Sequence, residues 1–68
     1  MLQLEMETFC TCKRTVVNVG DKIVVAGGDG RHYSGIVKED LSADLKYRRH
    51  HIKNADLKSN FFRLVKLN

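Results

Sequence analysis

The feature that most constrains the fold is a pair of short apolar runs joined by glycines, in the stretch VGDKIVVAGGDGRHYSGIV at residues 19–37. Gly and Asp at positions 20 and 21 supply turn chemistry. Ile23 and Val25 then share one face of a strand, and the glycine-rich segment 27–30 suits a tight loop between antiparallel strands. The stretch therefore predicts a hairpin, in which Gly35 marks a bulge or a bend of the returning strand.

A phosphate-binding loop is the competing interpretation of the same glycines. A P-loop needs Gly-Lys followed by Ser or Thr and then a helix, whereas Gly30 leads into Arg31, His32 and Tyr33. A dinucleotide-binding fingerprint fails as well, because Tyr33 stands where its third glycine belongs. The pattern favours the hairpin.

The first segment alternates between apolar and polar residues and predicts one half-buried strand over residues 2–13. Cys10 and Cys12 fall on its apolar face, where free cysteines are commonly buried as small apolar residues. A single Cys-X-Cys is a weak metal signal. His50 and His51 are adjacent and would point to opposite faces of a strand. We expect no metal site and no cofactor.

The remaining pattern predicts an all-β barrel of about five antiparallel strands, with the N-terminal strand as an extra. The other strands are expected at 15–18 joined to 22–26, 31–38, 45–52 and 61–67. Alternation is poor in 45–52, and a helix over 41–53 is an open alternative because Leu41 and Leu45 fit a 3.6-residue period. Leu57 is a further candidate for the interior. The expected core is Leu4, Met6, Cys10, Ile23, Val25, Ile36, Leu45, Phe61, Leu64 and Val65.

A chain of 68 residues is expected to form a single domain, 1–68, that is too small to enclose a large active site. No serine stands beside a recognisable base and orienting group, so we predict a binding module without catalytic residues. Residues 1–12 have a charge of −2 and residues 13–68 a charge of +6, which favours an anionic partner. No apolar run is long enough to span a bilayer, and no signal peptide is evident; we expect a cytoplasmic protein with no membrane partner.

A basic run between residues 46 and 53 is the strongest functional signal. Cations neutralise phosphates and an exposed aromatic ring stacks on an unpaired base, although a charged edge strand that resists aggregation has the same composition. Residues at the predicted hairpin tip extend this surface. The predicted nucleic-acid-binding residues are Arg31, Tyr33, Lys46, Tyr47, Arg48, Arg49 and Lys53.

The segment VGDKIVVAGGDGRHYSGIVKED resembles the KOW motif of NusG-type transcription factors and several ribosomal proteins. Gly20 and Asp21 match the opening pair, Ile23 and Val25 the strand, and Gly35 with Val37 the return. The C-terminal segment NFFRLVKLN is similar to the closing strand of such SH3-like barrels. The resemblance implies an SH3-like fold that binds DNA, RNA or a protein of the transcription or translation machinery. The N-terminal strand departs from the motif, and Tudor-like and Sm-like barrels share the hairpin style.

A protein-interaction module, or a small phage-like inhibitor of a host protein, is the alternative function. Such a protein would pair its edge strand 2–13 with a partner sheet, or with a second copy to form a homodimer. The two functions differ in what they require of Arg48 and Arg49, since an edge-strand interaction tolerates their replacement by alanine.

Overall fold

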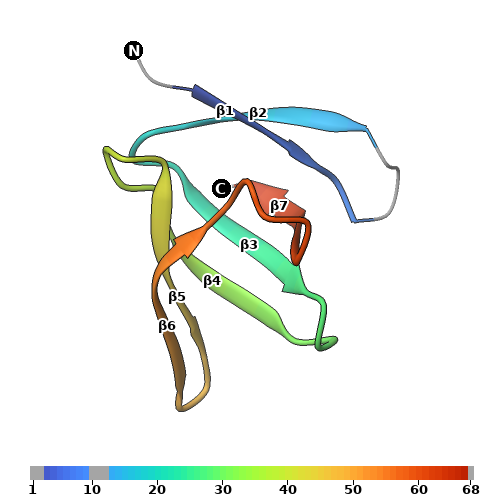
Figure 1. Ribbon diagram of the computed structural model, residues 1–68, viewed down its shortest axis with the longest axis vertical. Coiled ribbons are helices and arrows are strands. Elements are labelled where there is room, and N and C mark those ends of the chain that lie inside the picture. Colours follow the sequence, from blue (N-terminus) through green and yellow to red (C-terminus); the bar gives the residue numbers. More distant parts are fainter. Residues whose placement is uncertain (1–2, 10–12, 68) are drawn as a thin grey trace.

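The computed structural model describes residues 3–9 and 13–67, which form seven β-strands in two antiparallel sheets (Figure 1). The strands are β1 (Gln3–Glu7), β2 (Arg14–Asn18), β3 (Lys22–Gly27), β4 (His32–Ile36), β5 (Ser42–Tyr47), β6 (His50–Asp56) and β7 (Phe62–Leu67). Five strands form one sheet in the order β6-β5-β4-β3-β7, and β1 pairs with β2. The described residues contain no helix with the length and apolar character needed to cross a membrane.

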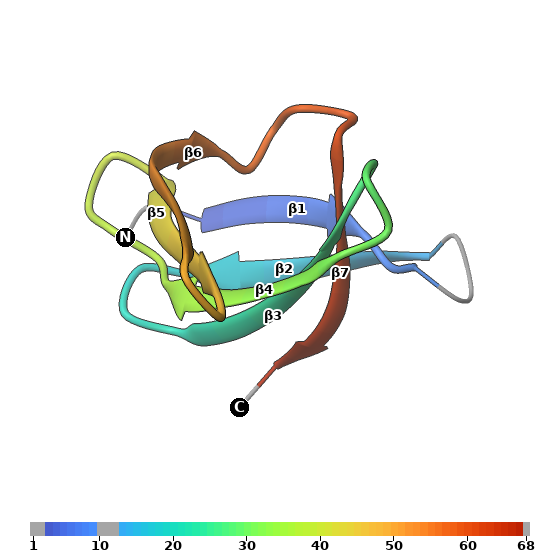
Figure 2. The same cartoon turned by 90° about the horizontal axis from the view of Figure 1, so that it is seen from below.

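The two sheets meet where the end of β1 runs beside β7. Thr8 forms a parallel bridge with Leu64, and the Phe9 N–H donates to the Leu64 carbonyl oxygen at 2.7 Å. The connection after β6 returns the chain to β7 at the opposite edge of the five-stranded sheet, as Figure 2 shows. The all-β prediction is confirmed, and the arrangement is compatible with a small SH3-like barrel.

The hairpin predicted from the glycine-rich stretch is present as β3 and β4, with Val24 opposite Ser34. Gly30 adopts a φ of +82°, and the Gly27 N–H donates to the Arg31 carbonyl oxygen at 2.8 Å. The Gly-Asp turn before β3 is present as well, because Gly20 has a φ of +89°. These turns follow from local backbone chemistry, which explains why the sequence predicts them.

The prediction of a single strand over residues 2–13 is wrong. β1 ends at Glu7, and β2 begins at Arg14 and pairs back along β1, with Leu4 opposite Val17 on the inward face. The predicted strand 15–18 therefore belongs to an N-terminal hairpin. Cys10 and Cys12 lie outside the described residues.

The predicted strand 45–52 is also two strands, and the helix alternative over 41–53 is wrong. β5 and β6 form a hairpin in which Leu45 lies opposite Ile52 and Tyr47 opposite His50. Only Arg48 and Arg49 separate the two strands. The poor alternation has a simple cause: a two-residue turn moves the inward positions from odd to even numbers.

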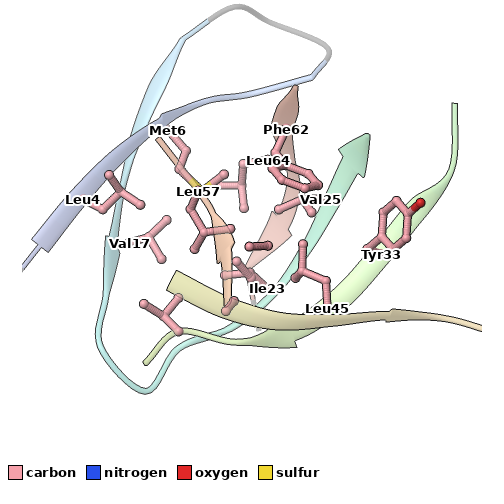
Figure 3. Close-up of a cluster of buried hydrophobic side chains, with 13 residues drawn as sticks. Leu4, Met6, Val17, Ile23, Val25, Tyr33, Leu45, Leu57, Phe62 and Leu64 are labelled. Atoms are coloured by element: carbon pink, nitrogen blue, oxygen red, sulfur yellow. The ribbon is translucent and has the colours of Figure 1, made fainter. Parts of the chain in front are cut away.

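A cluster of thirteen buried side chains lies between the sheets (Figure 3). It comprises Leu4, Met6, Val17, Ile23, Val25, Tyr33, Val37, Ala43, Leu45, Ala55, Leu57, Phe62 and Leu64. The burial of Leu57 confirms that candidate. Six of the ten expected core residues are confirmed by this cluster, and Cys10 lies outside the described residues.

The other three expected core residues, Ile36, Phe61 and Val65, are exposed by 56%, 44% and 39%. Alternation along β4 points Tyr33 and Val37 inward, so Ile36 faces outward. In β7, the inward positions are Phe62 and Leu64. The partner register shifts between Val24 and Val25, which leaves Val65 between two paired residues.

Gly35 lies close to the backbone of β5. A Cβ on residue 35 would come well within 3.0 Å of the Asp44 carbonyl oxygen. The β5–β6 register shifts at the same place, between Ala43 and Leu45. The predicted bulge at Gly35 is wrong, because β4 pairs with β3 from Ile36 to His32 without a register shift. The glycine instead leaves room for the close approach of β5.

Candidate functional site

The turn between β5 and β6 presents two arginines at the tip of a hairpin. Tyr47 and His50 close the turn as opposite residues, and their rings stack at 6.3 Å between centroids with 24° between planes. Arg48 has a φ of +52°, a conformation that costs a residue with a Cβ about 1–2 kcal/mol. Two-residue turns with a positive φ at the first position favour glycine there for this reason, so Arg48 occupies an unfavourable position.

Arg31 reaches the same place from the loop between β3 and β4. Its Cζ lies 5.9 Å from the centroid of the Tyr47 ring, and the Arg48 Cζ lies 5.4 Å from the same centroid. Both distances are within the range of a cation–π contact. The shared hollow is lined by Arg31, Tyr47, Arg48, Arg49 and His50, and we call it the arginine hollow.

The arginine hollow has little compensating negative charge. A carboxylate oxygen of Asp29 lies 3.8 Å from a terminal nitrogen of Arg31. Within residues 3–9 and 13–67, no carboxylate lies within ion-pair distance of Arg48 or Arg49. Arg31 and Arg48 therefore lie beside one half-buried aromatic ring, and Arg49 lines the same hollow. Together the three guanidinium groups can attract an anionic ligand.

Tyr33 does not present its ring to solvent, contrary to the base-stacking role predicted for it. The residue is only 3% exposed, and its ring packs edge-on against Tyr47 at 6.0 Å between centroids. Its hydroxyl donates to Oδ2 of Asp29 at 2.7 Å. This hydrogen bond lowers the pKa of Asp29 and raises the pKa of Tyr33, because it favours the ionised carboxyl and the neutral phenol. Tyr33 therefore packs against Tyr47 and is not one of the residues that line the hollow.

Lys46 and Lys53 lie outside the arginine hollow. Lys46 is exposed on the outward face of the five-stranded sheet, where it pairs with Ser34 on one side and His51 on the other. Lys53 is exposed two residues after His51 on the edge strand β6. The structure therefore divides the predicted surface into a compact group of arginines and a separate pair of lysines.

Three residues near the hollow were not among those predicted. His50 stacks on Tyr47, Asp29 accepts the Tyr33 hydroxyl, and Phe61 is 44% exposed near the β3–β4 loop. The inward-facing positions change from an odd residue number at Tyr47 to an even one at Ile52. In the sequence, this change is the signal that identifies the turn and places His50 beside Tyr47. Phe61 and Asp29 have no comparable signal, because their proximity depends on how separate strands pack.

Other concave surfaces have mixed charge. The hollow beside β1 is lined by Glu5, Glu7, Arg14 and Arg63 among others, and Arg63 Nε pairs with a carboxylate oxygen of Glu7 at 3.1 Å. In the described part of the chain, no three His, Cys, Asp or Glu side chains are grouped closely enough to hold a metal ion. Of these two hollows, the arginine hollow has the larger excess of positive charge.

Comparison with known proteins gives no relative from which a function can be carried over. No protein-family model matches the chain, and neither a curated protein nor a solved structure is significantly similar to it.

Proposed function

We propose that this protein is a binding module for nucleic acid, and that the arginine hollow is its contact surface. The observation that carries the proposal is that Arg31, Arg48 and Arg49 line one hollow together with Tyr47, where Asp29 is the carboxylate described at ion-pair distance from one of them. Guanidinium groups bind phosphate oxygens in a bidentate manner and stack on planar groups. Planar cationic and aromatic side chains side by side suit a ligand that has both phosphates and bases.

The backbone at Arg48 supports the same proposal. Among the described residues, positive φ occurs elsewhere at Gly20 and Gly30, at Asn54 and at Leu41. Arginine takes this position in the β5–β6 turn, although glycine or asparagine would relieve the strain. Strained residues are concentrated at functional sites, and a contact between Arg48 and a ligand explains why arginine occupies this position.

The KOW resemblance implies DNA, RNA or a protein of the transcription or translation machinery as the partner, and each of these is a prediction. The cytoplasmic location is a prediction as well. The edge-strand alternative has one structural observation in its favour. Among the described strands, β1, which lies within the predicted edge strand 2–13, pairs along its length only with β2, and its other edge has only the bridge between Thr8 and Leu64 at its end. We favour nucleic acid because the positive charge concentrates at the hairpin tip, where Arg48 also has a positive φ.

A salt titration of nucleic-acid binding tests the proposal. Fluorescence anisotropy would measure affinity for single-stranded RNA, single-stranded DNA and duplex DNA of mixed sequence. The log of the affinity is expected to fall linearly with the log of the salt concentration. If each arginine neutralises one phosphate, Arg48→Ala/Arg49→Ala should reduce the magnitude of this slope by about 1.4 on a single strand, or about 1.8 on B-DNA. Alanine has a Cβ as well, so the backbone strain at residue 48 is unchanged.

The matched control is Lys58→Ala/Lys66→Ala, which removes the same two charges from exposed residues outside the hollow. This variant should keep most of the slope and affinity. Equal losses in both double variants would contradict a specific site and indicate general attraction to a basic protein. A ligand whose binding is unchanged by Arg48→Ala/Arg49→Ala would favour the edge-strand alternative.

A further inference from the structure

The loop between β3 and β4 holds a partly exposed carboxylate beside the arginine hollow. Oδ1 of Asp29 accepts the Arg31 backbone N–H at 3.1 Å, and Oδ2 accepts the Tyr33 hydroxyl at 2.7 Å. The Asp29 side chain is 34% exposed. Each carboxylate oxygen can accept two hydrogen bonds. The two bonds therefore fix the orientation of the carboxylate and leave acceptor capacity on both oxygens.

An exposed aromatic ring adjoins this carboxylate. Gly27 has no Cβ, and the point where one would sit lies 2.7 Å from Asp29 Oδ1 and 3.0 Å from Phe61 Cε2. The Phe61 ring also lies against Gly28, at 3.0 Å from its missing Cβ. The Phe61 N–H donates to the Ser59 hydroxyl at 3.2 Å, which helps to position the residue. A stacking surface and a pair of acceptors thus lie side by side.

We infer that Asp29 recognises the hydrogen-bond donor edge of an unpaired base stacked on Phe61, with a preference for guanine. This inference rests on the proposed function and names the ligand class more closely. Guanine carries two neighbouring donors on its Watson–Crick edge, N1–H and the N2 amino group, which match the two oxygens of a carboxylate. The other bases place an acceptor beside each Watson–Crick donor. Unpaired bases in RNA are commonly read on this edge while they stack on aromatic rings.

Arg31 is placed to contact the backbone of the same nucleotide or its neighbour. Its guanidinium lies between Asp29, at 3.8 Å, and the Tyr47 ring, at 5.9 Å from the centroid. The Asp29 carboxylate next to the arginine hollow would repel phosphate if it acted on charge alone. Base recognition gives this carboxylate a role that is consistent with the cations around it.

Asp29 also stabilises its own loop, and the test separates the two roles. Asp29→Asn keeps one carbonyl oxygen as an acceptor and replaces the other with an amide NH₂, which cannot accept from guanine. Tyr33→Phe removes a support of the loop and leaves the carboxylate in place. Preference for guanine should therefore be lost in Asp29→Asn and kept in Tyr33→Phe. Thermal unfolding of both variants would report their stability separately.

The probe is a short oligouridylate with one central guanosine, compared with the same strand carrying inosine or uridine at that position. Inosine lacks only the N2 amino group. The wild-type protein should bind the guanosine strand about tenfold more tightly than the inosine strand, within the roughly 5- to 150-fold range of a bidentate contact. Asp29→Asn should bind the two strands equally.

Equal affinity of the wild-type protein for guanosine, inosine and uridine strands would overturn the inference and leave the proposed function standing. An unchanged guanosine preference in Asp29→Asn would overturn it as well. Absence of binding to every nucleic acid in both assays would instead refute the proposed function, and the inference with it.

Discussion

Replacing Gly35 with alanine should strongly destabilise the fold. The new methyl group would point at β5, well within 3.0 Å of the Asp44 carbonyl oxygen, 3.2 Å from the Asp44 carbonyl carbon and 3.0 Å from a methyl group of Leu45. The nearest atom is a backbone oxygen, which cannot rotate away as a side chain does. β5 would have to retreat from β4 by several tenths of an ångström.

The cost can be worked from this geometry. Overpacking a tight interior by one methyl group costs about 1–3 kcal/mol, and a retreat of β5 also weakens the pairing of Ser34 with Lys46. We expect a loss of about 2–3 kcal/mol in the free energy of unfolding, against a total of roughly 3–10 kcal/mol for a chain of this length. For a domain of this size, each kcal/mol corresponds to about 4–8 °C in Tm.

Thermal and urea unfolding, followed by circular dichroism, would measure this loss with two matched controls. In Gly28→Ala the new methyl group meets only the Phe61 ring, at 3.0–3.1 Å, and this exposed side chain can move. In Gly30→Ala nothing lies within 4 Å, so the variant isolates the cost of a φ of +82°, about 1–2 kcal/mol. If Gly35→Ala proves as stable as Gly28→Ala, the close approach of β5 to β4 is not as described.

Two further predictions concern the turns around the arginine hollow. Arg48→Gly relieves the strain of a positive φ, and this gain offsets the flexibility that glycine adds to the unfolded chain. The stability of this variant should stay within about 0.5 kcal/mol of wild type. Arg49→Gly has no positive φ to relieve and should lose about 0.5–1 kcal/mol of stability. Equal losses in thermal unfolding would contradict the strain at Arg48. The hydrogen bond between Tyr33 and Asp29 should make stability depend on pH at both extremes. The lowered pKa of Asp29 contributes stability above 3.8 that is lost as pH falls through the lowered value, and the raised pKa of Tyr33 contributes stability that is lost as pH rises above 10.0. Urea unfolding of wild type and Tyr33→Phe should show the difference between them shrinking in both ranges, and a constant difference would refute the coupling.

The sequence predicts the β3–β4 hairpin well because its signals are local. Gly20 and Gly30 adopt positive φ, and Ile23 and Val25 point inward as alternation requires. The β5–β6 turn is missed because it contains no glycine, asparagine or proline. Its backbone is held in place by the pairing of Leu45 with Ile52, a contact that propensity at Arg48 and Arg49 does not indicate.

The residues of the candidate site were likewise only partly predictable from the sequence. The basic run that contains Tyr47, Arg48 and Arg49 is visible in the sequence, and so is Arg31 at a hairpin tip. Lys46 and Lys53 belong to the same run, yet they lie on the outward face and the edge of the sheet. Tyr33 is buried because the odd-numbered residues of β4 face the core. The sequence interpretation instead placed Ile36 in the core, which assigns the opposite set of residues to the interior.

The sequence by itself determined the all-β class, the turns at glycine and the excess of positive charge, because alternation, backbone freedom and net charge are properties of neighbouring residues or of composition. Tertiary structure alone decided which side chains meet: Arg31 with the Arg48–Arg49 turn around Tyr47, and Asp29 with Phe61 beside Gly27. These groups come from separate strands, and their distances depend on strand register and sheet curvature, which arise only when the whole core packs.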